Sequence, residues 1–390
     1  MIKQYYKQAL AQLRQHPLIS IIGIVGTALS IFLIMLVVMM QQVKVAPFSP
    51  ESNRNRFLHV HYMSISHKDW GNGTSNGPMS VQTAREVYKS LKTPEAVTVY
   101  CCMTVSTPVS LPGAPAIGAD VRETDDTFFH VFDFQFTDGK PYDEATFTAG
   151  RPVAVITESI SRALFGSIQS VGKEFLLSHA PYRVVGVVKD VSTLADMAYG
   201  QVWIPFTSTN LSNDTWSDNH MGMMSVTLLA HDREDFDEIR AEAKRRMNEY
   251  NSILADQGYT LIDRNRPYDQ ETQSISFAAN LEPDLKAARR ERVIIFIILL
   301  LVPAINLSSM TQSRLRQRVA EIGVRRAFGS TRIEMVGQIV MENLVITLLA
   351  GAIGLLISIL FAYWGTDILF AQPYSCLLYT SPSPRDRTRS

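Results

Sequence analysis

Charge, cysteine and catalytic motifs are all scarce in this sequence of 390 residues. Lys and Arg number 37, as do Asp and Glu, so the formal net charge is zero and only 19% of residues are charged. This balance gives no general attraction for nucleic acid and argues against a nucleic-acid-binding function. Cys101 and Cys102 are adjacent, and a bridge between neighbours would be strained. We interpret them as small apolar residues of a strand, with an intermolecular disulfide as the alternative.

No nucleotide, metal or catalytic motif is complete. The stretch 166–173, GSIQSVGK, has the spacing G-x5-G-K-E and lacks both the register and the hydroxyl of a phosphate loop. His59, His61 and His67 would share a strand face, but no Cys or acidic ligand stands nearby at metal-binding spacing. No nucleophile, base and orienting acid are tied together by the sequence. We predict no catalytic residue, no metal site and no cofactor.

Three long apolar runs dominate the rest of the chain. Residues 18–40 form a charge-free run long enough to cross a bilayer of about 30 Å. The run 293–310 is shorter and contains Pro303, and the charge-free run 344–363 lies within a third predicted span, 336–364. A cleaved signal peptide is the alternative for the first run, but its apolar part is too long and no small-residue cleavage site follows. We predict a membrane protein with three α-helical spans.

The charges flanking these runs predict the topology. Residues 1–17 carry Lys3, Lys7 and Arg14 without an acidic residue and have the spacing of an amphipathic helix on the membrane surface. The segment 311–335 has six arginines against two glutamates. Short basic segments stay in the cytoplasm, so residues 41–292 are expected outside, and the external loop 365–375 follows the third span.

The external residues 41–292 alternate between strand and helix patterns, which predicts a large α+β domain inserted between the first and second spans. A strand is expected at 153–156, followed by a helix that Gly166 ends, and a second strand at 182–190. Helices are expected at 80–91, capped by Ser80, and at 232–250. Residues 69–79, rich in Gly, Pro, Asn and Ser, predict a flexible loop.

The segment between the second and third spans has the signals of a stiff elbow. Gly329 is placed to end one helix in a left-handed conformation. Thr331 and Glu334 have the spacing of a capping box, so a new helix is expected to begin at once. A loose tether would need neither signal. The alternative is a basic helix whose side chains extend into the lipid headgroups.

Small residues recur every fourth position in the third span, and this spacing permits close contact between membrane helices. From it we predict a homodimer or a dimer with a paralogous chain. The stripe consists of Ala350, Gly354, Ser358 and Ala362.

The sequence resembles a known family at two separate places. "EIGVRRAFGSTRIEMVGQIVMENL" resembles the cytoplasmic segment of FtsX/MacB-type permeases of ABC transporters. "DDTFFHVFDFQFTDGKPY", "RPVAVITESISRALFG", "VGKEF" and "YRVVGVVKD" are similar to the MacB-type periplasmic core domain. The order of the parts also matches that family: a basic N-terminal helix, a span, a large domain, a second span, a basic helix and a third span. The resemblance implies a coupling helix that docks on a separate cytoplasmic ATPase subunit, and its residues here are Glu321, Gly323, Arg325, Arg326, Ala327 and Gly329.

The same resemblance implies a function and a location. ATP would be bound only by the partner ATPase, and its hydrolysis would drive efflux of a peptide or macrolide, or release of a lipoprotein, by mechanical transmission through the spans. A periplasmic adaptor and an outer-membrane channel are further implied partners. The chain would lie in the cell inner membrane, with its N-terminus in the cytoplasm and residues 41–292 in the periplasm. The alternative is an FtsX-like regulator that passes ATPase motion to a cell-wall hydrolase.

The C-terminal residues 376–390 depart from the family pattern. Members of this size have a fourth span, whereas "CLLYTSPSPRD" looks like the translation of a sequencing adapter. We expect native sequence to stop near Ser375, with a Ser/Pro-rich disordered tail as the alternative.

Overall fold

The computed structural model describes residues 17–317, 319–329 and 331–362, which divide into two compact units. One unit holds the long helices on either side of the insertion, and the other is Val43–Leu285. The predicted surface helix 1–17, apart from Pro17, lies outside the described residues. So do the predicted loop 365–375 and the tail 376–390.

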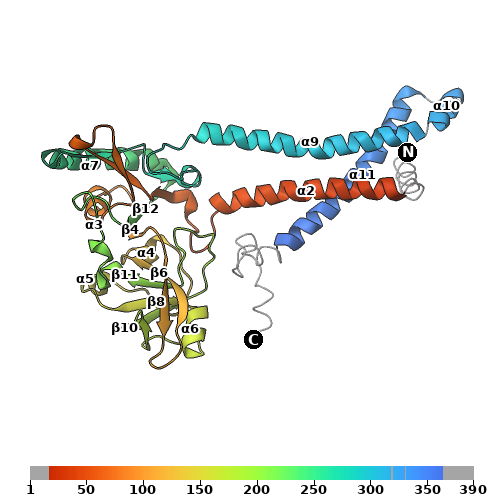
Figure 1. Cartoon of the computed structure of the whole chain (residues 1–390). Coiled ribbons are helices and arrows are strands. Elements are labelled where there is room, and N and C mark those ends of the chain that lie inside the picture. Colours follow the sequence, from red (N-terminus) through yellow and green to blue (C-terminus); the bar gives the residue numbers. More distant parts are fainter. Residues whose placement is uncertain (1–16, 318, 330, 363–390) are drawn as a thin grey trace. The chain divides into compact units, whose positions relative to one another are not determined.

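Among the residues described, three stretches are long and apolar enough to cross a membrane by length and composition, namely Ile21–Val45, Leu285–Ser313 and Met335–Leu360, and they lie wholly or mainly in the helical unit. They belong to helices α2 (Pro17–Val45), α9 (Leu285–Gln317) and α11 (Arg332–Leu360), with the short α10 (Val319–Ala327) between the last two (Figure 1). Pro17 is the first residue of α2, where its missing N–H costs little. Apolar side chains along α9, such as Ile298 and Ile305, are exposed, as expected of a surface that faces lipid.

The unit Val43–Leu285 is built mainly from strands. These are β1 (Phe57–Val60), β2 (Met63–His67), β3 (Thr74–Gly77), β4 (Ala96–Cys101), β5 (Val105–Ser110), β6 (Ile117–Thr124), β7 (Phe136–Gly139), β8 (Val153–Thr157), β9 (Glu174–Leu177), β10 (Ala180–Val188), β11 (Val202–Pro205), β12 (Met224–Leu229), β13 (Tyr259–Ile262) and β14 (Tyr268–Asp269). All but β2, β3 and β13 join one sheet in the order β11-β8-β10-β9-β5-β6-β4-β12-β1-β14, and β7 adds to β10.

Part of this sheet closes into a barrel. β11 pairs with β8 on one side and with β6 on the other, so β5, β6, β11, β8, β10 and β9 form a ring without a free edge. The inward-facing side chains of these strands form one core, with Ile156, Phe175 and Val184 almost fully buried. Helix α6 (Glu158–Phe165) packs on the same core through Ile160, and Gly166 ends it at φ 68°.

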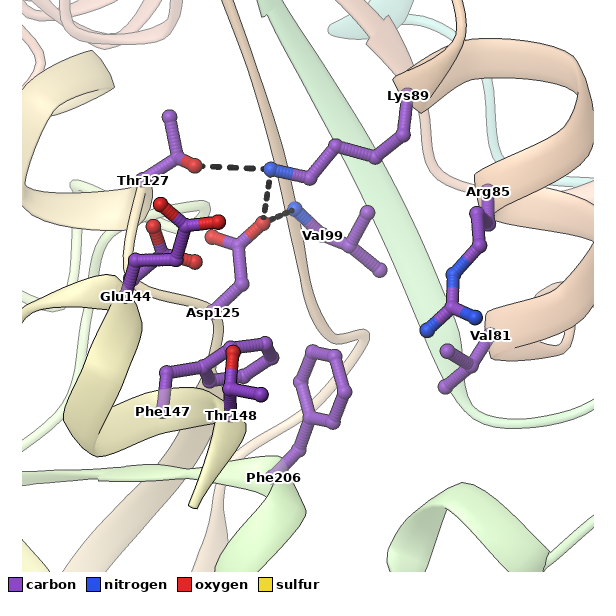
Figure 2. Close-up of a pocket in the computed structure, with 11 residues that line it drawn as sticks. Val81, Arg85, Lys89, Val99, Asp125, Thr127, Glu144, Phe147, Thr148 and Phe206 are labelled. Atoms are coloured by element: carbon purple, nitrogen blue, oxygen red, sulfur yellow. Dashed lines mark hydrogen bonds and ion pairs between the residues drawn. The ribbon is translucent and has the colours of Figure 1, made fainter. Parts of the chain in front are cut away.

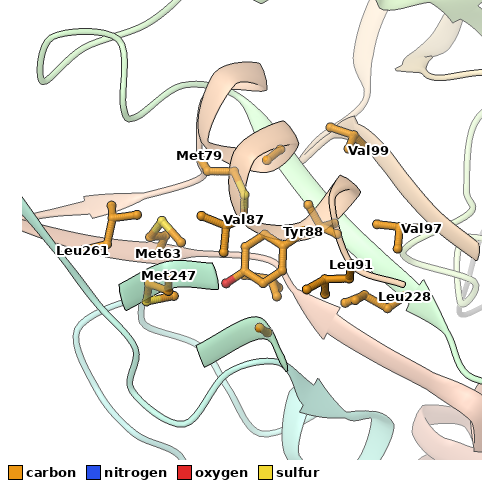
Figure 3. Close-up of a cluster of buried hydrophobic side chains, with 14 of the residues drawn as sticks. Met63, Met79, Val87, Tyr88, Leu91, Val97, Val99, Leu228, Met247 and Leu261 are labelled. Carbon is orange, nitrogen blue, oxygen red and sulfur yellow. The ribbon is translucent and has the colours of Figure 1, made fainter. Parts of the chain in front are cut away.

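A second core lies where β4, β12 and β1 continue the sheet beyond the barrel. Helices α3 (Val81–Ala84), η3 (Arg85–Lys89) and α7 (Phe236–Leu254) pack on it. Figure 3 shows Tyr88 at the centre of this core, surrounded by Met79, Val87, Met247 and Leu228. The unit is completed by α4 (Phe128–Val131), α5 (Glu144–Thr148) and α8 (Gln270–Gln273).

Most local predictions for this domain are confirmed, and two are wrong in detail. The strand and helix of 153–166, the strand near 182–190 and the long helix after residue 232 are all present. The predicted loop 69–79 instead contains β3, because its backbone pairs in antiparallel register with β2. The helix expected at 80–91 begins as predicted, with the Ser80 hydroxyl accepting from the Thr83 N–H, but it widens to i→i+5 bonding in η3.

Candidate functional site

The elbow between α9 and α11 is a short helix closed by a glycine. α10 ends at Ala327, and Gly329 adopts φ 92°, the left-handed conformation that the sequence predicts. Its N–H donates to the carbonyl of Arg326 at 3.1 Å. A Cβ at Gly329 would meet no atom within 4 Å, so backbone conformation rather than space requires glycine here. α11 then begins at Arg332, directly after Thr331.

The elbow presents an exposed surface of mixed character. Gly323, Arg326 and Ala327 are exposed, and no atom lies within 4 Å of a Cβ placed on Gly323. Phe328 and Ile333 are 89% and 85% exposed, an unusual fraction for large apolar side chains. Glu321 and Arg325 lie within α10, and their side chains are outside the described part of the structure. Exposed aromatic and basic groups together are typical of a protein-binding surface.

The predicted stripe of small residues is buried in the structure. Ala350, Ser358 and Ala362 are at most 7% exposed, and Gly354 is buried between them. A Cβ on Gly354 would lie 2.7 Å from the carbonyl oxygen of Ala28 on α2. Only a glycine therefore allows this approach of the two backbones.

The stripe is thus covered by α2 of the same chain, where α11 crosses it (Figure 1). The ring of Phe32 on α2 meets that of Phe361, the residue after α11, edge to face, with 5.4 Å between the ring centroids. The Ser358 hydroxyl donates to the Gly354 carbonyl of its own helix at 2.7 Å, so its hydrogen bond is satisfied without a partner from another helix. A dimer contact would accordingly use another surface of the helical unit.

α9 and α11 are joined by a polar contact that the sequence analysis did not single out. The Thr311 hydroxyl lies 3.1 Å from Oδ1 of Asn343, and it also contacts the Leu307 carbonyl. Such contacts hold helices together where no hydrophobic force does so in lipid. Asn343 lies directly before the charge-free run 344–363, and a polar side chain at this place is the sequence feature that could have predicted the contact.

The domain Val43–Leu285 contains a pocket of about 440 Å³ beside the core that surrounds Tyr88 (Figure 2). One wall is η3 and its neighbour Val81, and the other comes from the segment after β6 and from α5. Phe147 and Phe206 form its floor, with ring centroids 4.9 Å apart and nearly perpendicular planes. The wide helical turn of η3, which carries both Arg85 and Lys89, is a distortion often found at functional sites.

The charges around the pocket are only partly paired. The Lys89 ammonium lies 2.8 Å from Asp125 Oδ2 and donates to the Thr127 hydroxyl at 2.8 Å. Burial raises the pKa of the Asp125 carboxyl, while Lys89 and the N–H of Val99 act in the opposite direction. Arg85 makes no ion pair within the described ranges, and its guanidinium faces the open space. The pocket could hold a ligand with an apolar part and an acidic or polar group.

The histidines and cysteines considered above have ordinary structural surroundings. His59 is buried between Thr227 and Gln270, and His61 contacts the Ser225 hydroxyl. In the parts of the chain that are described, no three His, Cys, Asp or Glu residues are grouped as metal ligands. Cys101 and Cys102 are buried free thiols.

Comparison with known families covers both units. Residues 18–246 match the family model described as MacB-like periplasmic core domain, and residues 293–384 match that of the FtsX-like permease C-terminal domain. The first match spans more than half of the 390 residues. The chain belongs to the MacB-like family. Its two matched regions are thus a MacB-like domain and an FtsX-like permease domain.

The relatives of this MacB-like chain are ABC transporter proteins. It is 22% identical over 244 residues to the ABC transporter permease YknZ of Bacillus subtilis (strain 168), covering 61% of this chain and 55% of that protein. It is 24% identical over 244 residues to the macrolide export ATP-binding/permease protein MacB of Burkholderia cenocepacia (strain HI2424), covering 62% and 33% respectively. The chain therefore spans about half the length of the first relative and a third of the second.

Among solved structures, the periplasmic region of MacB from Actinobacillus actinomycetemcomitans is similar at 19% identity and a TM-score of 0.36. That similarity covers 52% of this chain and 88% of that one.

Proposed function

We propose that this chain is a permease subunit that couples ATP hydrolysis by a separate ATPase subunit to conformational work in its external domain. The exposed elbow of α10 and Gly329 carries this proposal, because it joins two helices of membrane length within the region that matches the FtsX-like permease. A stiff elbow can pass a push from a docked partner into both helices, whereas a flexible loop would absorb it. The proposal assigns ATP binding to a partner subunit, as the resemblance of the elbow sequence to FtsX/MacB-type permeases implies.

The docking surface in this proposal is the six-residue set of the sequence analysis, with Arg325 and Arg326 as its charged centre. Basic groups fix the orientation of a partner and speed its association. Phe328, the residue that follows the end of α10, joins this surface because it is 89% exposed.

The work done outside is proposed to be export of peptide- or macrolide-like molecules or release of a lipoprotein. A pocket of about 440 Å³ has an aromatic floor and includes Arg85, which has no ion pair among the described residues; this is the size and chemistry that small amphipathic ligands need. The proposed setting is the inner membrane, with the N-terminus and elbow in the cytoplasm and the large domain in the periplasm. Two permease chains, a periplasmic adaptor and an outer-membrane channel complete the proposed assembly.

The docking role is tested by the double substitution Arg325→Glu and Arg326→Glu. The ATPase that copurifies with the full chain from native membranes is identified, and its affinity for the wild-type and variant chains is compared. Reversing two interfacial charges is expected to weaken binding by roughly tenfold or more. ATP-driven change in the external domain should be lost with it.

The matched control is Arg245→Glu with Arg246→Glu, an adjacent arginine pair on helix α7 of the external domain. It makes the same change in net charge away from the elbow and should bind the ATPase as the wild type does. Undiminished binding and coupling in the elbow variant would refute docking at this surface.

A further inference from the structure

The last turn of α2 is held by side chains from the domain that follows it. The final carbonyls of a helix have no partners within the helix and must be satisfied from elsewhere. Arg54 Nη1 donates to the carbonyls of Val43 and Ala46 at 2.6 and 3.1 Å. Gln270 Nε2 donates to the carbonyl of Lys44 at 2.8 Å. All of these atoms belong to the unit Val43–Leu285.

Arg54 is itself fixed by the interior of the domain. It is 3% exposed and lies 2.6 Å from the carboxylate of Glu51, which is 1% exposed. Its Nη2 donates to the Leu194 carbonyl at 2.9 Å, and its guanidinium carbon lies 4.2 Å from the centre of the Phe48 ring. A positive charge at this end of a helix is also favoured by the helix dipole.

Glu51 extends this contact into the barrel. Its second oxygen, Oε1, accepts from the N–H groups of Met197 and Ala198, both at 3.0 Å. These residues lie on the segment that connects β10 to β11. The end of α2 is therefore linked through two buried, oppositely charged side chains to the backbone beside the closed barrel.

Gln270 is fixed by a buried chain of hydrogen bonds on the other side. Since its amide nitrogen donates to Lys44, its Oε1 faces His59 and accepts from His59 Nε2 at 2.8 Å. His59 Nδ1 then accepts from the Thr227 hydroxyl at 3.1 Å. The Tyr100 hydroxyl in turn donates to Thr227 at 2.8 Å, which connects β1, β12 and β4. Gln270 begins α8, the last helix before α9, so the entry and exit of the domain are held together here.

We propose that Arg54 and Gln270 are positioning residues that make the end of α2 one rigid piece with the external domain. This inference rests on the proposed function, in which movement of the membrane helices is passed to that domain. If these carbonyls were bonded only to water, the last turn of α2 would unwind under load and absorb the movement. With both side chains in place, α2 moves the barrel and the β4-β12-β1 sheet directly.

The test is amide hydrogen exchange on the full chain bound to its ATPase in lipid nanodiscs, with and without ATP held by vanadate. Two variants are compared with wild type: Glu51→Gln with Arg54→Gln, which removes both buried charges together, and Gln270→Ala, which leaves them intact. The matched control is Arg122→Gln. Arg122 is also a buried arginine that donates to backbone carbonyls, those of Tyr199, Cys101 and Asp196, but none of them is on α2.

In wild type and Arg122→Gln, ATP should change exchange both in α2 and in the domain peptides. In Gln270→Ala the ATP-dependent change in α2 should persist, while the change in the domain should fall by about fivefold, the factor expected from one lost hydrogen bond. Glu51→Gln with Arg54→Gln removes more than one hydrogen bond, so the change in the domain should fall by at least that factor. Equal domain responses in Gln270→Ala and wild type would overturn the inference while leaving the proposed function standing. Absence of any ATP-dependent change in the wild type would overturn the proposed function and the inference with it. If the double variant Glu51→Gln with Arg54→Gln does not fold, the result for Gln270→Ala alone tests the inference.

Discussion

At the scale of single residues, the domain Val43–Leu285 contains two buried tyrosines whose hydroxyl groups have opposite surroundings. Tyr100 and Tyr88 are 1% and 0% exposed, and both belong to the packed interior. The Tyr100 hydroxyl contacts Thr227 and the sulfur of Met197. The Tyr88 hydroxyl has no hydrogen-bond partner among the residues that the structure describes. Burial raises the pKa of both hydroxyl groups well above the usual value of 10, so both stay neutral.

This contrast predicts different results from the same substitution. Tyr100→Phe should lower the free energy of unfolding by about 1–2 kcal/mol, because Thr227 loses one of its two buried hydrogen-bond partners. Tyr88→Phe should leave that free energy unchanged, or raise it by about 1 kcal/mol, because a desolvated hydroxyl is removed. Urea unfolding of the detergent-solubilised chain, followed by tryptophan fluorescence, measures both. A loss in Tyr88→Phe as large as that in Tyr100→Phe would contradict the assignment.

At the scale of elements, the contact between α2 and α11 depends on the absence of one side chain. A Cβ on Gly354 would meet the Ala28 carbonyl oxygen at 2.7 Å and Ile31 at 3.1 Å, whereas one on Gly351 would meet only Ile31, at an ordinary 3.7 Å. Gly354→Ala must therefore move one helix away from the other, which costs about 1–3 kcal/mol. Gly351→Ala should be neutral or stabilise by up to about 1 kcal/mol through helix propensity. Unfolding of the purified chain in increasing fractions of dodecyl sulfate compares the two, and equal stability would contradict the close approach.

The sequence could predict which face of a helix packs closely and where a helix begins or ends, but not which element it packs against. The four-residue spacing of Ala350 and Gly354 predicts a close contact, yet it cannot identify α2 as the neighbour. Gly329 and Ser80 are recognisable because a left-handed turn and a helix cap need particular residues. The strand β3 was missed because its pairing with β2 uses backbone groups that any residue carries.

The same limit applies to the candidate sites. The elbow is contiguous in sequence, so its residues could be predicted together. The pocket brings Arg85, Asp125 and Phe206 together from three separate elements, and no local spacing relates them. Closure of the barrel depends likewise on β6 meeting β11 across some 80 residues, from Val121 to Val202. Pairing at such separation is set by the whole fold rather than by local propensity.

At the scale of the whole molecule, the buried His59 and the half-buried Glu123 of the domain Val43–Leu285 make stability depend on pH in opposite directions. Burial lowers the pKa of His59 to about 4, with a smaller opposing effect from the Gln270 hydrogen bond, and Arg54, His61 and Asp269 are the charged or titratable groups around it. Burial raises the pKa of Glu123 to about 7, against the hydrogen bond from Thr209. Because the ordinary values are 6.5 and 4.5, both groups act in the same window between about pH 4 and 7.

The signs follow from which state binds the proton. The unfolded chain protonates His59 first as pH falls, so this residue removes stability between about pH 6.5 and 4. The folded chain keeps Glu123 protonated longer, so this residue removes stability as pH rises from about 4.5 to 7. Each shift is about 2.5 units, which at about 1.4 kcal/mol per unit corresponds to roughly 3 kcal/mol at most. The two effects offset each other in the wild type.

Single substitutions should therefore separate the two effects. The stability of His59→Gln relative to wild type should improve as pH falls from 6.5 to 4, after a constant offset for its altered hydrogen bonds. Glu123→Gln keeps an oxygen that can accept from Thr209, and its relative stability should improve as pH rises from 4.5 to 7. Urea unfolding at half-unit steps of pH gives both difference curves, which should slope in opposite directions and level off outside the window. A flat curve for either variant would show that its group has the same pKa in the folded and unfolded chain, because only a difference between the two states can link protonation to folding.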